Sequence, residues 1–190
     1  MTPLGAEIVR SIVGAVRIAL LDPAASAWFN LTLQGFWRSF LAPLLLAPFF
    51  LLIVLLEAAG AEETADPGAL ALMRVLSYGL GVVAFPLLMI PIAKAFQLTD
   101  AYVRYIILWN WSSVPLSLVT LPVMAVFAFD LVGGRTAAML SMTTVVSVLC
   151  YGYLVAREGL RCPPLMAGAV AMTDFVLTLA VSSLPQRVAG

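Results

Sequence analysis

Histidine is absent from this 190-residue chain, and charged residues make up only 11% of it. Without histidine, the chain lacks the commonest general base and metal ligand of proteins. Its formal net charge is zero, so no basic field indicates nucleic acid as a partner. The two cysteines, Cys150 and Cys162, have a spacing that matches no zinc or redox motif, and we interpret them as small apolar side chains.

The chain also lacks the sequence patterns of common catalytic sites. It contains no H-E-x-x-H, no paired acids, no Ser/His arrangement and no glycine-rich phosphate loop. Ser112 and Ser113 have no base nearby in the sequence. We therefore expect a protein that is not an enzyme, with no catalytic residue, no cofactor and no bound metal.

Hydrophobic residues are abundant instead, at 63% of the chain, with a mean hydropathy of +1.06. Soluble domains are about 45–50% apolar and about 25% charged. The uncharged runs are each long enough, or nearly so, for the roughly 20 residues of a membrane-spanning helix. They cover residues 39–56, 75–93, 105–129, 136–156 and, interrupted only by Asp174, 162–186. We predict a single-domain, all-α membrane protein, with an interfacial region at 1–38 and a five-span bundle at 39–190.

Lysine and arginine positions predict the orientation, because cytoplasmic loops carry an excess of these residues. If the N-terminus is cytoplasmic, seven of them lie on the inner side and three on the outer side. The inner set is Arg10, Arg17, Arg38, Lys94, Arg104, Arg157 and Arg161, and the outer set is Arg74, Arg135 and Arg187. We predict a bacterial inner-membrane protein with a cytoplasmic N-terminus and a periplasmic C-terminus.

The first 38 residues have a different pattern from the spans. Polar residues share one helical face of the segment LGAEIVRSIVGAVRIALL, and branched apolar residues form the opposite face, which is typical of a helix lying on the bilayer. We expect five residues of this region to contact the membrane surface: Arg10, Arg17, Arg38, Trp28 and Trp37. Such a helix would serve as a lid on the bundle or as a docking site. A cleaved signal peptide is disfavoured, because Arg17 and Asp22 interrupt and close the apolar core.

Asp174 is the only charged residue between Arg161 and Arg187. On a helix it belongs to a stripe of small and polar residues, formed by Ala167, Ala171, Asp174, Thr178 and Ser182. Such residues favour close helix packing and hydrogen bonds between helices. An acid within a span is by default a functional hypothesis, because burying its charge costs at least about 2.5–3.5 kcal/mol.

The third uncharged run carries a matching polar face at Asn110, Ser113, Ser117 and Thr120. We expect the two faces to pack into one intramembrane site that also includes Asp174 and Thr178. There Asp174 would accept hydrogen bonds from Ser117, Ser113 or Asn110, or donate one when protonated. Three interpretations of Asp174 remain open: helix packing, a proton- or cation-linked role, and contact with another subunit.

Two stretches, LDPAASAWFNLTLQGFWRSF and YIILWNWSSVP, look like segments of small inner-membrane proteins of alphaproteobacteria. The five-span arrangement with an interfacial N-terminal region resembles the Yip-domain family. The family's eukaryotic Asp-Leu-Tyr-Gly-Pro signature is absent, so the resemblance assigns no functional residue here. It implies a scaffold or accessory subunit that acts in the lipid bilayer with a membrane-protein partner or as a homo-oligomer. The alternative is a small-solute or ion transporter, or a channel subunit, that uses Asp174 and the polar face of the third span.

Overall fold

The computed structural model describes residues 3–59 and 67–189, and these residues form helices and turns with no strand among them. The helices in chain order are α1 (Leu4–Ala19), the short 3-10 helix η1 (Ala25–Trp28), α2 (Leu33–Ser39), α3 (Leu41–Ala59), α4 (Pro67–Ala95), α5 (Thr99–Ala128), α6 (Gly134–Leu160) and α7 (Pro164–Ala189). The prediction of an all-α fold is therefore confirmed for the described residues.

Five helical stretches are long and apolar enough to cross a membrane. They are Leu33–Leu56, Ala71–Ala95, Thr99–Ala128, Gly134–Leu160 and Pro164–Pro185. This confirms the five long apolar segments expected from the sequence and is consistent with a multi-pass membrane protein. The first stretch begins at Leu33 rather than at 39, because α2 continues almost directly into α3. Part of the predicted interfacial region thus belongs to the first long helix.

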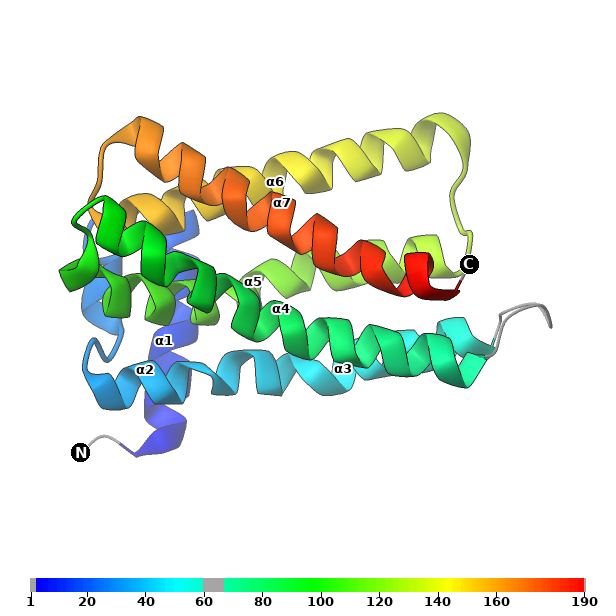
Figure 1. Ribbon diagram of the computed structural model, residues 1–190, viewed down its shortest axis with the longest axis horizontal. Coiled ribbons are helices and arrows are strands. Elements are labelled where there is room, and N and C mark those ends of the chain that lie inside the picture. Colours follow the sequence, from blue (N-terminus) through cyan, green and yellow to red (C-terminus); the bar gives the residue numbers. More distant parts are fainter. Residues whose placement is uncertain (1–2, 60–66, 190) are drawn as a thin grey trace.

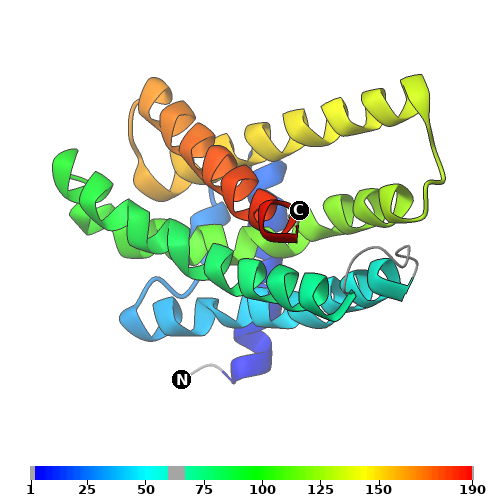
Figure 2. The same cartoon turned by 45° about the vertical axis from the view of Figure 1, so that its right-hand side comes forward.

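The long helices α3 to α7 run side by side, and α1 crosses them near one end (Figure 1). The turned view in Figure 2 shows the same crossing. We call the end of the bundle that α1 crosses the α1 end; it also holds the α4–α5 and α6–α7 turns. The opposite end, called the far end, holds the α5–α6 connection and the end of α7 (Figure 1).

The turn between α6 and α7 shows why the chain reverses there. Arg161 ends α6 in the left-handed conformation, with φ of 50°, and Pro164 begins α7. Proline suits the first position of a helix, where its missing N–H leaves no bond unmade. At the other end of α6, Gly134 has φ of +53°, a conformation that glycine adopts at little cost. The sequence GG at 133–134 therefore marks the turn before this helix.

The core is concentrated toward the α1 end. Residues 105–108 at the start of α5 are each no more than 1% exposed, and they pack with Phe85 and Met89 of α4. The Phe85 and Tyr105 rings meet edge to face at 6.1 Å, a favoured aromatic geometry. The Tyr151 hydroxyl donates to the Ala15 carbonyl oxygen at 2.8 Å, which ties α6 to α1. This end of the bundle is consequently closed by packed side chains.

Candidate ligand-binding cavity

The polar face of α5 turns toward α3, α4 and α7. Asn110, Ser113, Ser117 and Thr120 lie three or four residues apart, so they share one side of the helix. The hydroxyls of Ser113 and Ser117 donate to carbonyl oxygens of their own helix, to Asn110 and to Val114, each at 2.6 Å. These bonds satisfy the hydroxyl protons within apolar surroundings, and each oxygen keeps lone pairs that can accept a further hydrogen bond.

This face lines a cavity of about 540 Å³, which we call the far-end cavity. Side chains from α3, α4, α5 and α7 form its wall, and the cavity is open to the surface on one side. Most of the wall is apolar, with members such as Phe50, Val82, Leu121 and Met124. Pockets of about 300–1,000 Å³ that combine apolar walls with a few polar groups commonly hold small molecules.

Four of the predicted polar residues come from α5 and a fifth, Thr178, comes from α7. All five line the far-end cavity, and the Thr178 side chain is exposed. The structure thus brings together five of the six residues that the sequence placed in an intramembrane site. Ser182, one turn after Thr178, also lines the cavity. The polar faces of α5 and α7 therefore both line one cavity.

Asp174, the sixth residue, has a different partner from those expected. The indole Nε1 of Trp109 donates to its Oδ2 at 3.0 Å. The expected hydrogen bonds from Ser117, Ser113 and Asn110 are wrong, because those groups bond elsewhere. Asp174 is half-buried and does not line the cavity, whereas Trp109 does. The carboxylate is thus connected to the cavity wall through one indole ring.

Asn110 anchors the inner end of the cavity. Its Nδ2 donates to the Ser39 hydroxyl at 2.8 Å, and Ser39 in turn donates to the Phe36 carbonyl oxygen at 2.7 Å. The residue is 1% exposed, and its Oδ1 atom has no hydrogen-bond partner among the described residues. A buried amide oxygen without a partner costs about 1–3 kcal/mol. This oxygen is itself enclosed by protein atoms, so the polar contact that Asn110 makes beside the cavity is its bond to Ser39.

Sequence reasoning missed the contribution of α4. Arg74, Ser77, Tyr78 and Gly81 line the cavity, and their spacings of three, one and three residues place them on one face of the helix. The phenol of Tyr78 donates to the Pro43 carbonyl oxygen at 2.6 Å, so α4 is tied to α3 beside the cavity. The same periodicity argument that found the α5 stripe would have found this one.

The cavity is confined to the far half of the bundle. Its wall includes no α5 residue before Trp109 and no α4 residue after Val82. Beyond these positions lie the packed residues of the α1 end. The cavity is therefore closed toward α1. Among the described residues of its wall, the one cationic side chain is Arg74, in the part of α4 nearest the far end.

The sequence left open which face of the N-terminal helix meets the protein, and in the structure it is the polar face. Its polar face, with Glu7, Ser11 and Gly14, is buried against the rest of the protein, while Val9 and Leu20 are exposed. The polar face points inward because Glu7 forms an ion pair with Arg38 and accepts a hydrogen bond from Asn30 Nδ2 at 2.9 Å. The apolar side of the helix is only partly exposed, since Ile18 is buried and Ile8 and Ile12 pack against the core.

The five predicted surface residues all lie near the α1 end, in different surroundings. Arg38 is held by Glu7, and Arg17 pairs with Asp22 at 2.6 Å and lies 4.4 Å from the centre of the Trp28 ring. Trp37 is 68% exposed. Arg10 is exposed and donates only a long bond of 3.4 Å, to the Ala27 carbonyl oxygen. Trp37 and Arg10 are thus the two exposed members of this set.

No known protein-family model, curated protein or solved structure matches the chain. Among residues 3–59 and 67–189, no group of three or more His, Cys, Asp or Glu side chains could hold a metal ion.

Proposed function

We propose that this chain is a non-enzymatic, multi-pass protein of the bacterial inner membrane that binds an amphipathic small molecule in the far-end cavity. In this proposal it acts as a Yip-like scaffold or accessory subunit, together with a membrane-protein partner or a second copy of itself. The α1 end faces the cytoplasm and the far end faces the periplasm, which follows the lysine and arginine distribution.

The observation that carries this proposal is the composition of the cavity wall. An apolar wall from four helices suits a hydrocarbon body, and the strip of Asn110, Ser113, Ser117 and Thr120 offers a few polar contacts along it. We therefore infer a ligand with an apolar body and a polar end, such as a long-chain fatty acid.

Two glycines of α4 provide a matched test. A Cβ atom added at Gly81 or at Gly79 meets no other atom within 4 Å, so both positions tolerate larger side chains. Only Gly81 lines the cavity. Gly81→Phe should therefore fill the cavity, while Gly79→Phe should place its ring on the outer surface of the same helix.

The measurement is the binding of a fluorescent long-chain fatty acid to the purified full chain in detergent micelles. We expect Gly81→Phe to weaken binding at least about tenfold and Gly79→Phe to leave it within about twofold. Circular dichroism and thermal unfolding establish that both variants are folded. Equal binding by the two folded variants, or no saturable binding by the wild type, would overturn the proposal.

The second candidate function is transport of a proton or small cation. It is favoured by the bond from Trp109, a wall residue, to Asp174, the lone carboxylate of its helix. Transport would require the packed α1 end to open, because the cavity is blind there. Asp174→Asn keeps the side-chain shape and removes the exchangeable proton. A flux into liposomes that is present in wild type and abolished in this variant would favour transport over ligand binding alone.

A further inference from the structure

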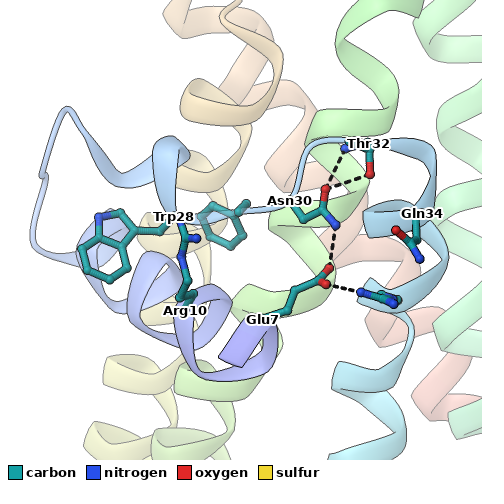
Figure 3. A pocket seen from close by; sticks show the side chains of 8 residues that line it. Glu7, Arg10, Trp28, Asn30, Thr32 and Gln34 are labelled. Atoms are coloured by element: carbon teal, nitrogen blue, oxygen red, sulfur yellow. Dashed lines mark hydrogen bonds and ion pairs between the residues drawn. The ribbon is translucent and has the colours of Figure 1, made fainter. Parts of the chain in front are cut away.

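A second cavity, of about 320 Å³, lies at the α1 end and differs in character from the first. It is lined by polar and charged residues of α1, α2 and the segment between them, including Glu7, Arg10, Asn30, Gln34 and Arg38 (Figure 3). We call it the α1 pocket. None of these residues lines the far-end cavity, so what the α1 pocket binds is independent of the function proposed above.

Among the described residues that line the α1 pocket, Glu7 is the one carboxylate, and both of its oxygens have a partner. One oxygen of Glu7 pairs with Arg38, and the other accepts the hydrogen bond from Asn30. Asn30 is held in turn, since its Oδ1 accepts from the Thr32 hydroxyl at 2.7 Å, as the dashed lines of Figure 3 show. Glu7 therefore neutralises Arg38 and fixes the wall, and it forms no ion pair with Arg10.

Arg10 carries the positive charge that no carboxylate of the pocket balances. Its guanidinium makes a single long bond to a carbonyl oxygen, and among residues 3–59 and 67–189 no carboxylate lies within ion-pair distance of it. Gln34 adds an exposed amide donor on the same pocket wall. With two guanidiniums and one carboxylate, the pocket has a net positive charge, which suits an anion such as a phosphate group.

Apolar side chains that adjoin the pocket residues in the sequence are exposed. Val9, Leu31, Leu33 and Trp37 are between 41% and 68% exposed, and each is the neighbour in sequence of a residue that lines the pocket. A ligand that consists of an anion alone would leave these side chains without a role. A ligand with an anionic head and hydrocarbon chains would cover both the polar and the apolar surface.

The place of the pocket in the fold agrees with such a ligand. It lies beside α1, which crosses the long helices near their ends, and the first long apolar helix begins at Leu33, within the pocket region (Figure 1). Lipid headgroups lie just beyond the ends of the apolar stretches of membrane helices. We propose that the α1 pocket binds the phosphate group of a glycerophospholipid, with Arg10 as its principal cationic contact.

Arg10→Gln tests the proposal, because it removes the charge and leaves a shorter, neutral amide. Arg10 makes only one long hydrogen bond, so we expect this variant to fold as the wild type does. Lys94→Gln is the matched control: Lys94 is exposed near the end of α4, at the same end of the bundle, and does not line the pocket. Both variants lose one positive charge.

The measurement is lipid retention by native mass spectrometry of the full chain in detergent micelles. The chain is titrated with phosphatidylglycerol, with diacylglycerol of the same acyl chains, and with inorganic phosphate. We expect phosphatidylglycerol to bind more tightly than diacylglycerol, and Arg10→Gln to weaken it about tenfold, which corresponds to about 1.4 kcal/mol. Lys94→Gln and Gly81→Phe should leave this binding unchanged, so failure here and failure of the far-end cavity are distinguishable.

Three results would overturn the proposal. Equal retention of phosphatidylglycerol and diacylglycerol would mean that the phosphate is not recognised. An equal loss in Arg10→Gln and Lys94→Gln would indicate general surface charge rather than a pocket. Binding of inorganic phosphate that depends on Arg10, without retention of phosphatidylglycerol, would assign the pocket to free phosphate instead of lipid.

Discussion

Replacing Gly159 with alanine should destabilise the protein, whereas the same change at Gly152 of the same helix should not. A Cβ atom at Gly159 would lie 2.8 Å from Cδ2 of Tyr105 and 2.9 Å from its Cα atom. The second contact is with backbone, so no side-chain rotation relieves it, and α6 must move away from α5. A Cβ atom at Gly152 meets only the Cβ of Ala171, at an ordinary 3.7 Å.

The magnitude follows from two opposing terms. Alanine in place of glycine within a helix stabilises by about 0.5–1 kcal/mol, and overpacking costs about 1–3 kcal/mol. Gly152→Ala should therefore gain about 0.5–1 kcal/mol. Gly159→Ala should be less stable than Gly152→Ala by about 1–3 kcal/mol. Separation of the helices would also strain the bond from Arg104 Nε to the Gly159 carbonyl oxygen, at 2.6 Å.

Reversible unfolding of both variants in mixed micelles, followed by circular dichroism, measures this difference. Equal stabilities for Gly159→Ala and Gly152→Ala would refute the close approach of α5 and α6 at Tyr105, and with it the packing that closes the α1 end.

Two further predictions concern the N-terminal region. Arg38→Gln should lower the free energy of unfolding by about 2 kcal/mol or more, because it leaves the Glu7 carboxylate buried without its ion pair. Adding Glu7→Gln should recover most of this loss. A double variant as unstable as Arg38→Gln would contradict this pairing. The pKa of Asp22 lies below its ordinary value of 3.8, because the Ala24 backbone N–H and then the Arg17 side chain favour the charged form. Its stabilising effect should therefore be present above about pH 4 and be lost as the pH falls through the lowered pKa. The difference in melting temperature between wild type and Asp22→Asn should disappear in acid, and a pH-independent difference would contradict this assignment.

The number of long helices could be predicted from the sequence, but their ends could not. Each uncharged run of the sequence falls largely within one of the five long apolar stretches of the structure. The helices extend past the runs because terminal turns accommodate charged residues: α5 begins at Thr99 and includes Asp100 and Arg104, and α6 includes Arg157. A long side chain can keep its apolar stem against the protein and its charged group in a polar region.

The orientation of α1 illustrates what periodicity leaves undetermined. The pattern correctly divides α1 into a polar and an apolar face, yet it does not determine which face meets the protein. That choice depends on Glu7 and Arg38, which are 31 residues apart in the chain. The same reasoning applies to Asp174, whose polar stripe was identified but whose partner, Trp109, depends on the rotation of two helices about their axes.

The most direct test of the far-end cavity is the location of a bound amphiphile. A fatty acid carrying a photoreactive diazirine on its chain is added to the wild-type protein in nanodiscs, crosslinked, and mapped by peptide mass spectrometry. We predict adducts concentrated on cavity-lining residues such as Ser77 and Val82 of α4 and Leu116 and Leu121 of α5, and their loss in Gly81→Phe. Adducts spread equally over outward-facing residues such as Leu118, and unchanged in Gly81→Phe, would contradict a ligand site in the cavity.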